Sequence, residues 1–176
     1  MNIAFEAVLR ALGLFYVLSG VLVVRSLAVS AMADATYSAI VGTPTHPAER
    51  AREIWLAAGS VLIGVGGLAL VLLLDVAAVL FILGAIQQLA YLGFIAPRYF
   101  DPHDEPDAGG RAKTWNAAIV YVVATALVVA VARGGVLRPW LDAPVWLLVA
   151  AGVAIVAGVV WTVRALSVRG SVGKAE

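Results

Sequence analysis

The chain has 176 residues and a formal net charge of +1, with 62% hydrophobic and 13% charged residues. In soluble domains about half of the residues are apolar and about a quarter are charged, so this chain, with a mean hydropathy of +0.98, belongs to the membrane class. The balanced charge gives no reason to expect nucleic acid as a partner. The absence of cysteine excludes disulfides, thiolate nucleophiles and iron–sulfur clusters.

The apolar segments predict an all-α fold, a polytopic membrane helical bundle with about five transmembrane helices arranged as a four-helix core plus one. A span needs about 20 apolar residues, so the whole chain, 1–176, forms a single transmembrane domain. The predicted spans cover about 8–30, 54–74, 76–96, 115–132 and 145–163, and polar loops cover 34–53 and 97–113.

The first apolar segment carries three charged side chains. Glu6 precedes Arg10 by four residues, which is the favoured order for an ion pair on a helix. Arg25 is expected near a headgroup level, where it either snorkels or binds a lipid phosphate or a carboxylate partner. An alternative interpretation is a cleaved signal peptide with 11–24 as its apolar region, which leaves four spans.

The polar segments that follow carry the turn signals. In 34–53 a glycine and two prolines break the helix, and Pro47 suits the first turn of the second helix. Asp75 alone separates two long apolar runs, so we expect a tight hairpin with Asp75 capping the third helix. Prolines and glycines make 97–113 a loop. Its acidic group and His103 match no metal-binding spacing, and no metal site is predicted: Asp101, His103, Asp104, Glu105, Asp107.

Aromatic and basic residues predict the orientation in the membrane. All five tryptophans fall at predicted helix ends, where amphipathic rings collect at the headgroup level. The two polar loops and the C-terminal tail share most of the Arg and Lys residues, so the positive-inside rule puts the N-terminus outside and the C-terminus in the cytoplasm. Arg outnumbers Lys, and Ala, Val and Gly are abundant, as in GC-rich bacterial genomes. We therefore expect a bacterial inner membrane.

Polar groups within the predicted spans are few. No Asp, Glu, His or Lys lies clearly inside one, which argues against a haem held by paired histidines and against a proton relay. Gln87 and Gln88 lie near the middle of 76–96, with Tyr91 one turn further on. Their amides need partners on other helices, for which the candidates are Tyr16, Ser19, Ser60, Tyr121 and Thr125. They serve either as hydrogen bonds between helices or as a pocket for a quinone headgroup, a lipid or another small amphiphile.

Small residues predict where helices pack closely. Gly13 and Gly20 recur at an interval of seven in the first span, and Gly64 lies in the second. In the fifth span the interval is four: Ala150, Ala154, Gly158. Such stripes allow backbones to approach closely in lipid.

The opening run Arg10-Ala11-Leu12-Gly13-Leu14-Phe15-Tyr16, with Gly20 behind it, resembles the small DoxX-like bacterial membrane proteins. The resemblance covers the first helix and the general layout. It implies a four-helix bundle that is sometimes tied to quinone-linked oxidoreductase systems, and it transfers no catalytic residue. This chain is predicted to carry one span more.

These observations predict a non-catalytic accessory or scaffold subunit of a bacterial inner-membrane complex. The lipid bilayer and other membrane subunits, or further copies of the chain, are the expected partners. The alternative is a quinone- or lipid-binding protein linked to a redox system, with Gln87, Gln88, Tyr91, Tyr16 and Arg25 as candidate ligand-binding residues. A small transporter is the third hypothesis, although neither inverted repeats nor buried charges favour it. An enzymatic role is not favoured, and no cofactor is predicted beyond a possible quinone or lipid.

Overall fold

The structure is a computed structural model that describes residues 3–42, 47–100 and 108–167. Within these residues the chain forms helices and no β-strand, which confirms the all-α bundle. The elements are α1 (Ile3–Val41), α2 (Pro47–Val71), α3 (Val76–Ala90), the π-helix η1 (Tyr91–Phe100), α4 (Ala108–Arg133), the short 3-10 helix η2 (Trp140–Asp142) and α5 (Val145–Ser167).

Four of the described helical segments are long and apolar enough to cross a membrane: Ile3–Asp34, Glu49–Val71, Val76–Phe100 and Gly109–Arg133. The fifth helix, α5, has a shorter apolar part, Leu148–Arg164. Many large apolar side chains on these helices are exposed, as expected where lipid replaces water as the solvent. The chain is therefore a membrane helical bundle with four span-length helices and a shorter fifth one.

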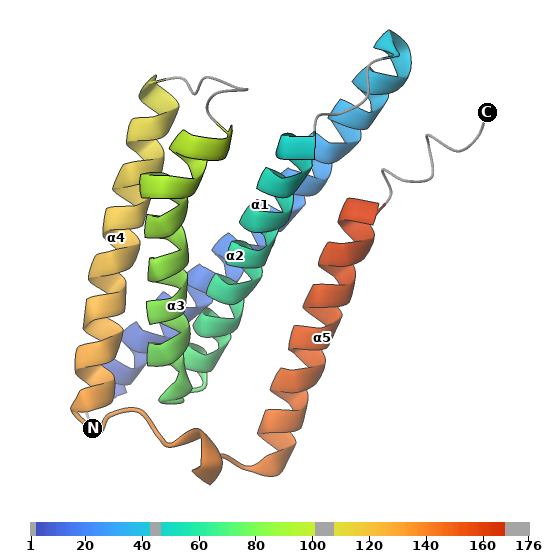
Figure 1. The fold of residues 1–176 in the computed structure, drawn as a ribbon. Helices are drawn as coiled ribbons and strands as arrows, with labels where there is room; N and C mark the ends of the chain where they lie inside the picture. The colour runs from blue at the N-terminus through green and yellow to red at the C-terminus, as the bar shows by residue number, and fades with distance from the viewer. Residues whose placement is uncertain (1–2, 43–46, 101–107, 168–176) are drawn as a thin grey trace.

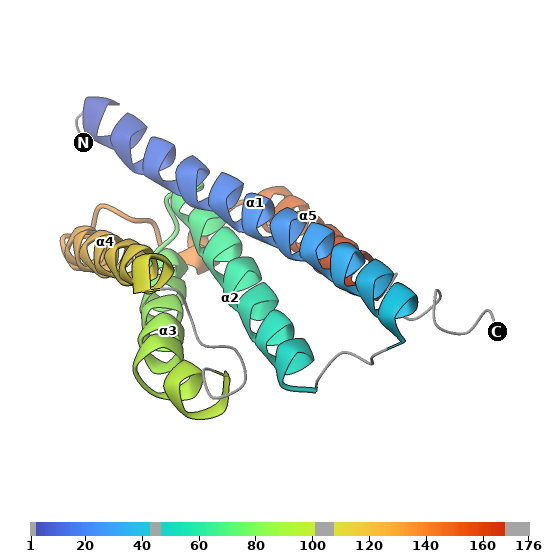
Figure 2. The same ribbon diagram turned by 90° about the horizontal axis from the view of Figure 1, so that it is seen from above.

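The helices are arranged as a core of α1 to α4 with α5 on one side (Figures 1 and 2). Neighbours along the chain pack against each other from α1 to α4, and α5 contacts α1 and α2. Figure 1 shows the N-terminus, the α2–α3 turn and the α4–α5 linker at one end of the bundle, which we call the turn end. At the opposite end, the loop end, α2 and α3 diverge.

Glycines bring α1 and α2 into close contact. A Cβ atom added to Gly13 would lie 2.7 Å from the carbonyl oxygen of Gly67, and one added to Gly20 would lie 2.7 Å from that of Ser60. Any side chain at these positions would push the two backbones apart. Gly20 also approaches Gly64, since a Cβ atom added to Gly20 would lie 3.2 Å from the Gly64 Cα.

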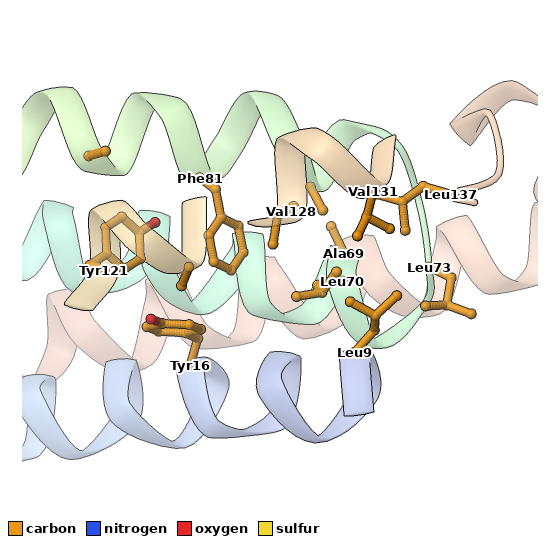
Figure 3. Close-up of a cluster of buried hydrophobic side chains, with 13 residues drawn as sticks. Leu9, Tyr16, Ala69, Leu70, Leu73, Phe81, Tyr121, Val128, Val131 and Leu137 are labelled. Atoms are coloured by element: carbon orange, nitrogen blue, oxygen red, sulfur yellow. The ribbon is translucent and has the colours of Figure 1, made fainter. Parts of the chain in front are cut away.

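The best-packed part of the core lies toward the turn end (Figure 3). Its largest fully buried side chains come from the four helices α1 to α4 and from the α2–α3 turn: Leu9, Leu70, Leu73, Phe81, Val128. On the loop-end side of this cluster, the Tyr16 ring packs edge-on against Phe81 and Tyr121, both at 5.2 Å between ring centroids. Phe81 and Tyr121 stack at 5.4 Å. Edge-to-face and stacked rings of this kind stabilise a core beyond the area that they bury.

The expected hairpin between the second and third helices is confirmed, and Asp75 occupies the N-cap position of α3 as predicted, but its side chain does not cap the helix. Leu73 adopts a left-handed conformation (φ 55°), and the Leu74 N–H donates to the Ala69 carbonyl at 3.0 Å. These are the marks of a Schellman ending, which glycine usually provides. Asp75 makes no capping hydrogen bond with α3, because its carboxylate accepts one from the Trp140 N–H at 3.0 Å instead.

The α4–α5 linker is fixed to this turn. Glycine ends α4 in the usual way, since Gly135 has φ +69° and the Val136 N–H donates to the Val131 carbonyl at 3.3 Å. The Arg138 N–H then donates to the Leu73 carbonyl at 2.8 Å, and the Arg138 carbonyl accepts from the Asp75 N–H at 2.9 Å. The linker therefore closes the turn end of the bundle.

Both predicted polar loops are shorter than expected. α1 continues to Val41, because 34–41 contains neither Gly nor Pro, and it ends before Gly42 at φ +71°. α2 begins at Pro47, as predicted. In the second loop, η1 continues through Pro97 to Phe100 as a π-helix, a form that often accompanies a break in regular helical bonding. The acidic residues of that loop lie outside the described residues, and so do both histidines, His46 and His103.

Candidate functional site

A pocket of about 240 Å³ lies toward the loop end of the four-helix core, and we call it the amide pocket. All four core helices and η1 contribute to its lining. The lining residues are Val23, Trp55, Leu56, Gly59, Ser60, Ile63, Gln87, Gln88, Tyr91, Leu92, Thr114, Ala117 and Ala118. An engineered apolar cavity of about 150 Å³ holds benzene, so this pocket has room for a small ring or a branched headgroup.

Gln87 joins α3 to α2 across the pocket. Its Nε2 donates to the main-chain carbonyl of Trp55 at 3.1 Å, which has a second lone pair for a bond outside its helix. Gly59 makes this approach possible, because a Cβ there would lie 2.9 Å from the same nitrogen. None of the side chains expected as amide partners fills this role for Gln87. That part of the prediction is wrong, because a backbone carbonyl cannot be recognised from residue types.

Two polar atoms of the pocket residues are buried without a hydrogen-bond partner, the Gln88 Oε1 and the Trp55 Nε1. A third is the hydroxyl of Tyr121, which lies against Gly84, one helical turn before Gln88. An unsatisfied buried donor or acceptor costs about 1–3 kcal/mol, and proteins carry few of them. Two of these atoms belong to residues that line the amide pocket, whereas the Tyr121 hydroxyl belongs to the aromatic cluster beside it.

Two of the three hydroxyl groups among the residues of the pocket wall are already occupied, and the third belongs to Tyr91. Ser60 donates to the Leu56 carbonyl at 2.8 Å, and Thr114 donates to the Gly110 carbonyl at 2.9 Å. Such bonds within one helix are common for Ser and Thr. Apart from Ser60 and Thr114, the side chains with polar groups in the lining are those of Trp55, Gln87, Gln88 and Tyr91.

None of the described residues that line the pocket is charged. A charged headgroup buried there would lack the opposite charge that compensates for its lost hydration. The pocket is thus suited to an uncharged headgroup on an apolar body.

The structure brings Gln87, Gln88 and Tyr91 together and places the other two candidate ligand-binding residues elsewhere. Tyr16 belongs to the aromatic cluster, and Arg25 is exposed on α1 and does not line the pocket. The predicted Glu6–Arg10 ion pair is present, at 3.2 Å. Trp55 was missed as a site residue, because among five tryptophans at helix ends nothing in the sequence distinguishes it.

A second cavity, of about 200 Å³, separates α5 from α1 and α2. Its wall is mostly apolar and includes four of the predicted packing residues, Gly20, Gly64, Ala154 and Gly158, whereas Ala150 lies outside it. A Cβ added to Gly64 or Gly158 would meet nothing within 4 Å. These positions therefore leave space between α5 and the core instead of a close contact.

Comparison with known proteins found no match to the chain among family models, curated proteins or solved structures.

Proposed function

We propose that the protein is a non-catalytic membrane subunit that binds a small uncharged amphiphile, such as a quinone or a neutral lipid, in the amide pocket. The observation that carries the proposal is the composition of this pocket, whose described lining is mostly apolar, carries no charge and includes the polar side chains of Gln87, Gln88 and Tyr91. Ligand sites are typically apolar concavities with a few polar groups that fix the orientation of the ligand. The amide pocket has this composition.

Filling the pocket tests the proposal. Ala117 lines the pocket, whereas Ala126 on the same helix is exposed and does not line it. Native mass spectrometry of the protein released from membranes should show an adduct of constant mass. Ala117→Trp should abolish this adduct and Ala126→Trp should retain it. An adduct that survives Ala117→Trp, or no adduct in the wild-type protein, would count against a ligand in this pocket.

A second function, that of an accessory or scaffold subunit, is favoured by the loose attachment of α5. Among the described elements, α5 makes substantial contacts with α1 and α2 alone. Large apolar side chains such as Trp146 and Val153 are exposed along it. Another membrane subunit or a second copy of the chain would cover this face. The particle mass, measured with bound detergent subtracted, tests this idea, because a strict monomer without a co-purifying protein would count against it.

We also propose a bacterial inner membrane as the location, with the N-terminus outside and the C-terminus in the cytoplasm. The support is the charge distribution on the folded bundle. The helix ends that Figure 1 shows at the loop end, namely the starts of α2 and α4 and the ends of η1 and α5, carry most of the described basic residues: Arg50, Arg52, Arg98, Arg111, Lys113, Arg164. Fewer lie at the turn end, and the side with more Arg and Lys faces the cytoplasm. The orientation is tested with single cysteines introduced at Ala143 and at Gly110, which lie at opposite ends of the bundle. The measurement is the labelling of each cysteine by a membrane-impermeant reagent.

A further inference from the structure

We propose that the second cavity, between α5 and the helices α1 and α2, holds an acyl chain of an anionic glycerophospholipid whose phosphate pairs with Arg25 and Arg164. The cavity is separate from the amide pocket, since Ser60 is the one described residue that lines both. Lipid binding here is therefore independent of the ligand proposed for the amide pocket.

The wall of this cavity is suited to hydrocarbon. None of its described lining residues is charged. The Thr162 hydroxyl donates to the Gly158 carbonyl at 2.8 Å, and the Ser60 hydroxyl is occupied in the same way. An apolar cavity of about 150 Å³ stays dry, and this one measures about 200 Å³. Inside a bilayer, the acyl chains of the surrounding lipids are the hydrocarbon that fills such a space.

The helix directions show which end of the cavity faces the headgroups. α1 and α5 both run from the turn end to the loop end, and α2 runs the opposite way (Figure 1). The lining residues nearest the loop end are therefore Val24, Ser60 and Thr162. The apolar part of α5 ends two residues beyond Thr162, at Arg164. The loop end of the cavity thus lies close to the level where hydrocarbon gives way to headgroups.

Two exposed arginines flank the cavity at this level. Arg25 follows the lining residue Val21 by four positions, and residues at this spacing share a helix face. Arg164 follows the lining residue Trp161 by three positions, with the same consequence. Neither arginine forms an ion pair with any residue that the structure describes. Arg25 lies within the span-length segment Ile3–Asp34, where a charge without a counter-charge is costly.

A lipid phosphate supplies the missing counter-charge, and arginine binds phosphate through two parallel hydrogen bonds. A zwitterionic lipid such as phosphatidylcholine brings its own cation beside the phosphate, whereas phosphatidylglycerol brings a net negative charge. Each basic residue near the membrane surface strengthens attraction to an anionic lipid about fivefold. Two arginines at one cavity therefore favour an anionic lipid by at least about tenfold.

Two lipids with the same chains test the headgroup. The full-length protein, delipidated in a non-ionic detergent, is titrated with dioleoylphosphatidylglycerol or dioleoylphosphatidylcholine, and native mass spectrometry counts the bound molecules. We expect one phosphatidylglycerol per chain, bound at least about tenfold more tightly than phosphatidylcholine. Equal affinities would overturn the assignment of an anionic lipid.

Charge variants test the two arginines. Arg25→Gln and Arg164→Gln should each weaken phosphatidylglycerol binding about fivefold and leave phosphatidylcholine binding within about twofold. Arg98→Gln is the matched control, because Arg98 is exposed on η1 at the same end of the bundle and is not among the residues that line this cavity. Equal losses in all three variants would mean that the lipid is attracted to the basic end as a whole, which overturns the site.

Filling the cavity tests where the chain binds. Gly158 lines the cavity, whereas Gly152 on the same helix does not, and a Cβ added to either would meet nothing within 4 Å. Gly158→Leu should therefore lower the affinity for phosphatidylglycerol at least about tenfold, and Gly152→Leu should leave it unchanged. Circular dichroism of both variants shows whether the helices are intact.

Three outcomes of these measurements decide the proposal. Phosphatidylglycerol binding that survives Gly158→Leu overturns it. A dimer that Gly158→Leu dissociates assigns this face to a second copy of the chain and also overturns it. Ala117→Trp, which fills the amide pocket, should leave phosphatidylglycerol binding unchanged, so that failure of one site is distinguishable from failure of the other.

Discussion

The Asp75 carboxylate accepts a hydrogen bond of 3.0 Å from the backbone N–H of Trp140, 65 residues further along the chain. Together with the two backbone hydrogen bonds of Arg138, it ties the α4–α5 linker to the α2–α3 turn. Leu137 of the linker is buried in the core beside this contact. The turn end is thus closed by backbone bonds and apolar packing, while the loop end holds the pocket.

Asp75→Ala should destabilise the bundle by about 1–2 kcal/mol, since hydrogen bonds to charged groups are worth about 1.5–3 kcal/mol and this one is partly exposed. Asp75→Asn retains an acceptor oxygen and should lose less than half as much. Thermal unfolding of the purified variants in one detergent measures the difference. Equal losses in the two variants would show that the negative charge matters and the hydrogen bond does not.

Gly84→Ala should destabilise the bundle by about 1–3 kcal/mol through overpacking, because its Cβ would lie 2.5 Å from the Tyr121 hydroxyl. Tyr121→Phe removes that hydroxyl, which has no partner, and should by itself be neutral or stabilising.

A double-mutant cycle measures the coupling between the two positions. The cost of Gly84→Ala should fall by at least about 1 kcal/mol in the Tyr121→Phe background. An unchanged cost would mean that the Tyr121 ring, and not its hydroxyl, lies closest to Gly84.

Adjacent glutamines should respond to the same substitution with opposite signs. Gln87→Leu loses the bond to the Trp55 carbonyl and should destabilise the protein by about 0.6–1.5 kcal/mol. Gln88→Leu removes a buried acceptor without a partner and should stabilise the ligand-free protein by about 1 kcal/mol. Unfolding in delipidating detergent compares the two, and a loss of stability in Gln88→Leu would show that its oxygen is already satisfied.

The glycine that ends α4 should be far less tolerant than its neighbour. Gly135 has φ +69°, a conformation that costs other residues about 1–2 kcal/mol, so Gly135→Ala should destabilise by about that amount. Gly134 lacks a positive φ, and an added Cβ would make ordinary contacts from 3.4 Å. Gly134→Ala is therefore the matched control, and similar melting temperatures for the two variants would contradict the proposed α4 ending.

Hydropathy predicted the helical bundle and the hairpin at Asp75, because the length of each apolar run is a local property of the sequence. The turn chemistry was not predictable in the same way. Leu73 occupies a left-handed position normally taken by glycine, and its burial in the core, where it is 2% exposed, compensates for the strain.

The candidate site was only partly predictable. Gln87, Gln88 and Tyr91 were recognised because polar side chains are rare in apolar spans. Their surroundings depend on how the helices cross, which composition does not determine. Trp55 of α2 lines the pocket together with Gln87 and Gln88 of α3, whereas Arg25 is exposed on α1 and does not line it.

Binding of an uncharged amphiphile in the amide pocket is tested most directly by organic extraction of the purified protein, followed by mass spectrometry. We predict one neutral amphiphile per chain in the wild-type protein and at least about a tenfold loss in the Gln87→Leu, Gln88→Leu double variant. Extracts that match the surrounding membrane lipids in both proteins would contradict the presence of a specific ligand.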